Sequence, residues 1–284
     1  MLSNLDNEVI FKKAFTDKVV FEQFVKDIVG IDINVGQIET EKKFTDKVGF
    51  IDIKFDIFAE SVDKRVIIEI QKVEYDYNFD RFMNYFLSAI IEQQKSSKQY
   101  KVEQTVYTIV ILTEPYTIRA KDGSWIQDEV LLSKLNPRNL KNKEVDLFSH
   151  ELIFLNPNYR SKDTEQRYKD WLDLIYESIH NPEKPKVNKK NLGIKKAIKL
   201  IDKNNLTNEE RTRMKESEGK KIVLKNQFEE GKKDEKISTI INGNREGASN
   251  EFLSKITGLS IKEIEEILKE QQPRHEENKK KKKK

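Results

Sequence analysis

The sequence has 284 residues, which is enough for one sizeable α/β domain and an appendage. Its mean hydropathy is −0.74, and it contains no long apolar run and no basic-then-apolar leader. It therefore predicts a cytoplasmic protein without a membrane span. Cysteine is absent, the three histidines stand isolated and no phosphate-binding glycine loop occurs, so disulfides, thiolate or histidine zinc sites and nucleotide hydrolysis are not expected. The formal net charge of +4 includes six lysines at 279–284, and subtracting these leaves −2 for residues 1–278, so net charge predicts no general affinity of the body for nucleic acid.

The first element expected is a helix over residues 7–29. Apolar residues recur there at near-helical spacing, and Gly30 is placed to end the helix. These apolar residues are Phe11, Phe15, Phe24 and Ile28. Residues 37–44 are rich in charge and are expected to form an edge strand.

Residues 50–72 have the pattern of two β-strands joined by a polar turn around residues 60–64. In the first strand, alternation separates an apolar face, Ile51, Ile53, Phe55 and Ile57, from a polar face, Asp52, Lys54 and Asp56. In the second strand, Arg65–Gln71, it separates Val66, Ile68 and Ile70 from Glu69 and Gln71. If the strands pair as a hairpin, one sheet face presents Asp56, Glu69, Lys54 and Gln71 together.

Two carboxylates on one sheet face allow two interpretations. They repel each other unless a cation lies between them, and a divalent metal ion is the usual solution. Alternatively, the hairpin has one solvated side, and Asp56, Glu69 and Lys54 are its surface residues. The hairpin pattern by itself leaves both interpretations open.

The next predicted helix lies within residues 75–94, with Asp76 or Asn78 available as its cap. Its expected apolar stripe is Phe79, Phe82, Met83, Phe86 and Ile90. Arg81 and Tyr85 lie four residues apart and therefore share one side of the helix. Two roles are compatible with the position of Arg81. It can form a surface salt bridge with a neighbouring acidic residue, or it can contact the carboxylates or a DNA phosphate.

Three further elements complete the predicted α/β part. The β-branched run at 105–112 is typical of a central strand that is buried on both faces. Residues 151–157 predict another strand, stopped by Pro157. A helix is expected from about Asp163 to the Asn181-Pro182 pair, and its apolar face is Tyr168, Trp171, Leu172, Ile175 and Ile179.

The composition changes after residue 180. Residues 181–245 are expected to form a charged linker and a helical arm, with Thr207 and Glu210 as a capping box. Residues 246–272 predict a small helix-turn-helix-like hairpin, whose second helix begins with a Ser260–Glu263 capping box. That helix is acidic, which opposes docking on DNA and favours packing or homo-oligomerisation. The Lys-rich residues 273–284 are expected to be disordered.

The order of Asp56, then Glu69-x-Gln71, resembles the motif of the PD-(D/E)XK nucleases. The segments FDIFAE and IIEIQ are most similar to the transposase branch of these nucleases, the recombination-promoting nucleases. That branch typically carries Gln where the parent motif has Lys. NEVIFKKAF resembles the opening motif of that family, with Glu8 at its acidic position. Arg81 and Tyr85 are similar to the Arg-x-x-x-Tyr of the helix that follows the motif. The resemblance covers about residues 7–160.

The resemblance implies an α/β fold with an αβββαβ core, here residues 1–180, and an α-helical C-terminal extension. It implies a DNA endonuclease of transposition or recombination that uses Mg²⁺ or Mn²⁺. It assigns three groups of residues: the metal ligands Asp56, Glu69 and the carbonyl of Ile70, the water-orienting Gln71, and the accessory residues Glu8 and Arg81.

Alternate residues of a strand share a face, so Lys54 is expected beside Asp56 on the face of the carboxylates. Lys54 is therefore a further catalytic candidate, as the source of the positive charge that Gln71 lacks. The alternative function is a catalytically inactive relic of a mobile element that binds DNA or another protein.

Overall fold

A computed structural model describes residues 1–44, 53–71, 79–94, 101–116 and 118–269, apart from the side chains of residues 221, 224, 225 and 228. The chain forms two compact units, Met1–Ser217 and Glu218–Lys284. No helix in the described ranges is both long enough and apolar enough to span a membrane.

The first unit is built on a six-stranded mixed sheet in the order β1-β2-β3-β4-β8-β7. Its strands are β1 (Ile38–Lys43), β2 (Lys54–Glu60), β3 (Lys64–Gln71), β4 (Thr105–Leu112), β7 (Val130–Lys134) and β8 (Glu151–Leu155). Strands β3, β4 and β8 run parallel, whereas β1, β2 and β7 pair antiparallel. The expected central strand is confirmed, because every residue of β4 from Val106 to Leu112 is buried. A separate hairpin consists of β5 (Ile118–Arg119) and β6 (Trp125–Ile126).

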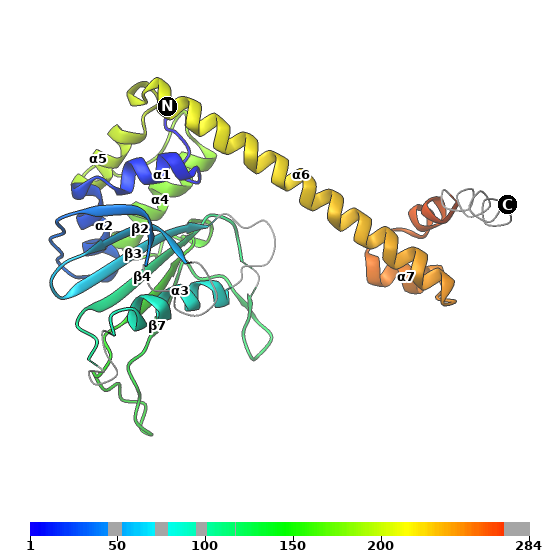
Figure 1. Cartoon of the computed structure of the whole chain (residues 1–284), viewed down its shortest axis with the longest axis horizontal. Coiled ribbons are helices and arrows are strands. Elements are labelled where there is room, and N and C mark those ends of the chain that lie inside the picture. Colours follow the sequence, from blue (N-terminus) through cyan, green and yellow to red (C-terminus); the bar gives the residue numbers. More distant parts are fainter. Residues whose placement is uncertain (45–52, 72–78, 95–100, 117, 270–284) are drawn as a thin grey trace. The chain divides into compact units, whose positions relative to one another are not determined.

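Helices cover both faces of the sheet (Figure 1). One face is covered by α1 (Glu8–Phe15), α2 (Lys18–Val29) and α4 (Gln166–His180), and α5 (Leu192–Ile201) packs on these helices. The other face packs against α3 (Phe79–Ile91). Short 3-10 turns follow β8 at Pro157–Tyr159 and α5 at Lys203–Asn205. In chain order the elements give the expected αβββαβ core, from the first helices through β1, β2, β3 and α3 to β4.

The predicted helix over residues 7–29 is in fact two helices. Helix α1 ends at Phe15, and the carboxylate of Asp17 accepts hydrogen bonds from the amides of Val19 (3.1 Å) and Val20 (3.3 Å). A carboxylate that satisfies these two amides acts as an N-cap, so it starts a new helix. The expected end is confirmed, because Gly30 caps α2 with a left-handed φ of 83°.

Strand alternation fails at one point of the hairpin. Ile57 packs in the core on the α1 side of the sheet, whereas Phe55 packs with Phe58 on the α3 side. The prediction that Phe55 and Ile57 share a face is therefore wrong. Regular pairing of β2 with β3 ends at Ile57, opposite Ile68. The pairing of β2 with β1 continues to Phe55 and Lys54 but skips Asp56, so the ladder is irregular at the residue where alternation fails. Ile51 and Asp52 lie outside the described residues.

The hairpin itself and the inner face of its second strand are confirmed. Strands β2 and β3 pair antiparallel around residues 61–63, and Val66 and Ile68 are buried in the core on the α1 side. Ile70 is partly buried against the same core.

Helix α3 confirms most of its expected stripe. Phe82 and Phe86 are buried, but Met83 is 38% exposed, so its place in the stripe was predicted wrongly. Tyr85 is buried instead. The candidate caps Asp76 and Asn78 lie outside the described residues.

Residues 181–217 belong to the first compact unit. Ile194, Ala197 and Ile201 of α5 are fully buried in the main core, beside α1 and α2. A segment that its composition assigns to a linker and arm therefore contributes a core helix. The boundaries at 180, 245 and 272 stay a prediction.

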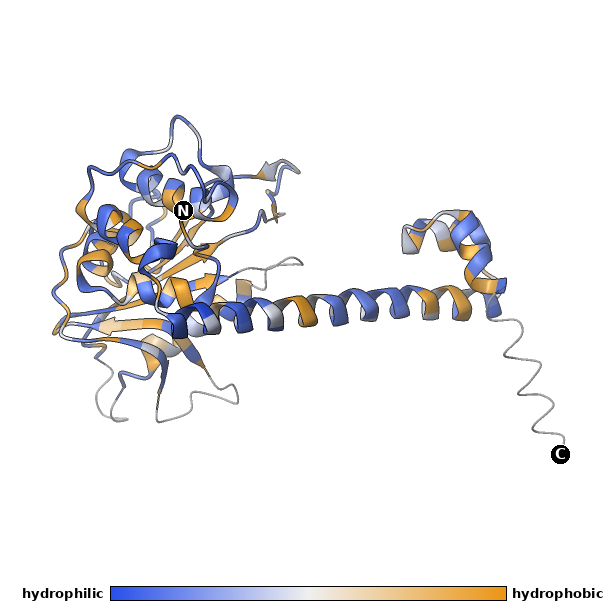
Figure 2. Cartoon of the chain, turned by 90° about the horizontal axis from the view of Figure 1, so that it is seen from above, coloured by the Kyte–Doolittle hydropathy of each residue, from blue (hydrophilic) through white to orange (hydrophobic). Residues whose placement is uncertain are grey.

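Helix α6 (Asn208–Arg245) begins at the predicted capping box. The amide of Glu210 donates to Thr207 Oγ1 (3.1 Å), and the amide of Thr207 donates to the Glu210 carboxylate (2.8 Å). The helix is hydrophilic along most of its length (Figure 2).

The second unit is helical. The end of α6, helix α7 (Asn250–Thr257) and the helical residues 261–269 enclose a small core of Ile240, Leu253 and Ile264. Gly258 ends α7 with a φ of 71°, and Ser260 and Glu263 form the predicted capping box. Residues 273–284, expected to be disordered, lie outside the described part of the chain.

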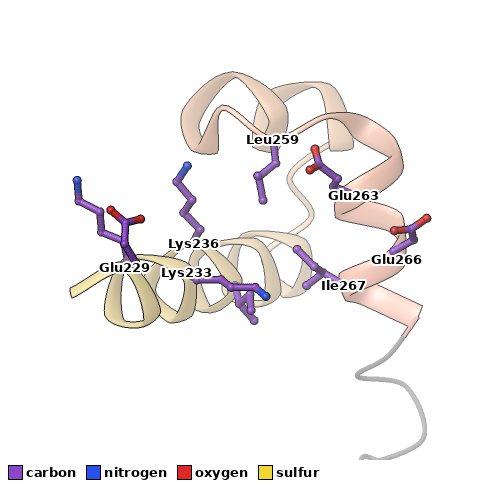
Figure 3. A pocket seen from close by; sticks show the side chains of 9 residues that line it. Glu229, Lys233, Lys236, Leu259, Glu263, Glu266 and Ile267 are labelled. Carbon is purple, nitrogen blue, oxygen red and sulfur yellow. The ribbon is translucent and has the colours of Figure 1, made fainter. Parts of the chain in front are cut away.

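A groove of about 550 Å³ lies within this unit (Figure 3). Lys233 and Lys236 line it from α6, Glu263 and Glu266 line it from residues 261–269, and Ile267 lies between them. Because both signs of charge line the groove, it does not form a basic surface for DNA.

Candidate active site

The predicted carboxylates meet where β2 and β3 stop pairing. The amide of Asp56 donates to Glu69 Oε1 (2.9 Å), and the amide of Ile70 donates to Asp56 Oδ2 (3.1 Å). Each carboxylate thus takes the place that a backbone carbonyl has in a regular ladder. These reciprocal bonds hold the two side chains next to each other in fixed orientations.

Burial disfavours the ionised form of both carboxyl groups, and repulsion by Asp56 adds to this effect at Glu69. Burial raises the pKa of Glu69 well above its usual value, and the nearby Asp56 carboxylate raises it further. Burial likewise raises the pKa of Asp56, while the hydrogen bond from Ile70 lowers it. Such a pair is stabilised by a bound proton or by a cation.

Two cations act on this pair from opposite faces of the sheet. Lys12 of α1 and Arg81 of α3 each lower the pKa of both carboxyl groups. Arg81 Nη1 donates to Gln71 Oε1 (3.2 Å), and Arg81 Nε donates to the Tyr85 hydroxyl (3.0 Å). Arg81 therefore orients Gln71, as well as contributing positive charge.

A chain of ion pairs borders the carboxylates on the other side. Lys12 pairs with Glu8 of its own helix and with Glu41 of β1 (2.6 Å). Lys54 pairs with the second oxygen of Glu41 (2.8 Å). Hydrogen bonds from Lys12 and then Lys54 lower the pKa of Glu41 to about 2, so it stays ionised. Glu41 itself has a left-handed φ of 55°, which is strained for a residue with a side chain.

The structure thus brings together Asp56, Glu69 and Gln71, with Arg81 in contact. Among the other sequence candidates, Glu8 lies in the pair with Lys12, and its charge raises the pKa of Asp56. Lys54 binds Glu41. The Ile70 amide binds Asp56, and a role for its carbonyl stays a prediction.

Sequence reasoning missed Lys12 and Glu41. Lys12 is the lysine of the Phe-Lys pair in the opening motif, and this pair is a signal by which the sequence could identify it. Glu41 is one of several charged residues in β1, and nothing in their order distinguishes it.

The donor set fits a small divalent cation. Within the described part of the chain, Oδ1 of Asp56 and Oε2 of Glu69 accept no hydrogen bond, so each carboxylate keeps one oxygen for a ligand. No cluster of three or more His, Cys, Asp or Glu side chains suited to a metal occurs among those residues. Two carboxylates are nevertheless enough for Mg²⁺, which keeps several waters and takes one or two protein carboxylates.

The fold and this carboxylate pair define an α/β protein of the PD-(D/E)XK nuclease class. A model of the PD-(D/E)XK nuclease family transposases matches residues 9–231, and the chain belongs to that family. Membership assigns the protein to nuclease functions related to transposition. No curated protein and no solved structure gave a match.

Proposed function

We propose that the protein is a DNA endonuclease that depends on Mg²⁺ or Mn²⁺ and acts in transposition or recombination. The observation that carries the proposal is the reciprocal bonding of Asp56 and Glu69, which leaves one oxygen of each carboxylate for a metal. Two buried carboxylates that repel each other destabilise the fold, and such groups are typical of functional sites. A cation site between them would explain why the chain keeps both.

In the proposed reaction, the oxygen of a water molecule bonds to phosphorus while the bond from phosphorus to one deoxyribose oxygen breaks. One water proton leaves to solvent and the departing oxygen takes up one proton, so a diester and water become a monoester and an alcohol. A divalent metal ion, when bound, activates water and neutralises charge on the phosphate.

The side chains have distinct roles in this scheme. Asp56 and Glu69 would hold the metal ion, and the Ile70 carbonyl would be a further ligand. Gln71 accepts a hydrogen bond from Arg81 through Oε1, so its amide nitrogen is the atom that can donate to the attacking water. Arg81 thereby fixes Gln71 in the orientation that the reaction requires.

The test is nicking of supercoiled plasmid by the purified protein, with Mg²⁺ or Mn²⁺ and with EDTA. Asp56→Asn keeps the shape of the side chain and removes its charge, and it is expected to abolish nicking and calorimetric Mn²⁺ binding. Asp63→Asn is the matched control, because Asp63 is an exposed carboxylate in the turn of the same hairpin and pairs with Lys64 (2.6 Å). Nicking that persists in Asp56→Asn would remove the site assignment.

The inactive relic remains the second candidate, and the uncharged Gln71 favours it. A folded wild-type protein that binds DNA but shows no metal-dependent nicking and no Mn²⁺ binding would establish this alternative.

A further inference from the structure

Hydrolysis of a phosphodiester at this site needs a positive charge besides the metal, because negative charge builds up on the phosphate. Gln71 supplies none. Arg81 is engaged by Gln71 and Tyr85, and its guanidinium lies over the Tyr85 ring, 5.2 Å from the centroid. Lys12 is the other cation whose charge lowers the pKa of both carboxyl groups.

Lys12 is held beside Asp56 by the sheet register. In the pairing of β1 with β2, Thr40 lies opposite Ile57 and Lys42 lies opposite Phe55, so Glu41 is the residue of β1 that faces Asp56. The ammonium of Lys12 binds this Glu41 at 2.6 Å. The Lys12 side chain is 17% exposed, so it is anchored in the unit but can still be reached by a ligand.

Lys12 can change partners at little cost. Its carboxylate partners, Glu8 and Glu41, are 49% and 45% exposed, and water can solvate them. Lys54 binds the other oxygen of Glu41, so that carboxylate keeps a cation when Lys12 leaves it. The strained backbone of Glu41 indicates that this arrangement is imposed by the surrounding structure.

We propose that Lys12 is the ammonium group of the active site and binds a non-bridging oxygen of the scissile phosphate in place of the charge that Gln71 lacks. Lys54 then has the different role of holding Glu41. This inference rests on the proposed nuclease function. It adds no proton transfer, because Lys12 remains protonated and acts by its charge.

The test compares Lys12→Met with Lys13→Met. Lys13 is the matched control, because it lies in the same helix and its side chain is 16% exposed. It is paired with Glu210 of α6 at 2.6 Å and not with a residue beside Asp56 or Glu69. Under saturating Mn²⁺, Lys12→Met is expected to lower the single-turnover nicking rate by about 10²- to 10³-fold. Lys13→Met is expected to keep the wild-type rate, and Lys12→Arg is expected to restore part of the loss.

A second readout does not depend on cleavage. With Ca²⁺ in place of Mn²⁺, anisotropy of a labelled DNA duplex gives the dependence of binding on salt. Losing one phosphate contact is expected to reduce the slope of log K against log salt by about 1 in Lys12→Met, and Lys12→Arg is expected to keep the wild-type slope. Calorimetric Mn²⁺ affinity is expected to be unchanged or tighter in Lys12→Met, because a competing positive charge is removed.

Several results would overturn the proposal. Weaker Mn²⁺ binding in Lys12→Met would show that Lys12 only supports the structure of the site. A large loss of rate in Lys54→Met with none in Lys12→Met would assign the charge to Lys54. If the wild type shows no metal-dependent nicking, the proposed function fails, and the salt slope still decides whether Lys12 binds phosphate.

Discussion

Replacing Glu69 by Gln and by Ala separates the structural role of this side chain from its charge. Gln keeps an oxygen where Glu69 Oε1 accepts the Asp56 amide hydrogen bond (2.9 Å), whereas Ala leaves that amide without its acceptor. Glu69 is only 3% exposed, so water does not readily replace the acceptor. Leaving a buried donor unsatisfied costs about 1 to 3 kcal/mol. Glu69→Ala is therefore expected to be less stable than Glu69→Gln by about that amount.

The same pair of variants measures the effect of a metal on stability. A metal that binds only the native state, at 100 times its dissociation constant, stabilises the protein by about 2.7 kcal/mol. For a unit of this size each kcal/mol raises the Tm by about 2–4 °C, so saturating Mn²⁺ is expected to raise the wild-type Tm by roughly 5–11 °C. Both variants lack the carboxylate and are expected to show little of this increase.

The assay is urea denaturation in EDTA for the structural difference, and thermal unfolding with and without Mn²⁺ for the metal. Equal stability of the two variants in EDTA would refute the structural role of the Asp56–Glu69 bond. A full Mn²⁺-induced increase in Tm in Glu69→Gln would refute the role of Glu69 as a metal ligand.

The remaining predictions concern pH and the C-terminal part of the chain. Burial and the Asp56 charge raise the pKa of Glu69 in the folded protein well above its unfolded value of 4.5. Protonation of Glu69 therefore stabilises the fold; this stabilisation is complete below the unfolded pKa and is lost as pH rises through the folded pKa. Without metal, the free energy of unfolding is therefore expected to fall over that pH range, and urea titrations should show a smaller fall in Glu69→Gln; identical pH profiles would contradict this assignment. Deleting residues 246–284 is expected to leave plasmid nicking measurable while changing assembly or DNA affinity, because every candidate site residue lies in Met1–Ser217. A truncated protein that is folded by circular dichroism but cannot nick would show that the deleted segment completes the site.

Local sequence patterns were enough to locate the carboxylates. Asp56 and Glu69 lie in adjacent strands of one hairpin, and hairpin pairing is set by alternation and turn length. The capping boxes at Thr207 and Ser260 were predictable for the same reason, since each is a contact between residues three positions apart.

Tertiary structure decided where the charges around the carboxylates come from. Lys12 and Glu41 are 29 residues apart in the chain, and they meet because α1 packs on the sheet beside β1. Such a contact leaves no periodic signal in a single sequence. The position of α5 in the core likewise depends on a surface that α1, α2 and α4 build together.

The failure of strand alternation at Phe55 has a physical reason that only the structure shows. On the β3 side of Asp56, the carboxylates of Asp56 and Glu69 bind backbone amides in place of ladder pairing, and on the β1 side the pairing skips Asp56 before it resumes at Phe55. The sequence by itself determined which carboxylate and amide side chains form the candidate site. The folded structure decided that the two carboxylates accept hydrogen bonds from backbone amides in place of ladder carbonyls, and that Lys12 lies beside them.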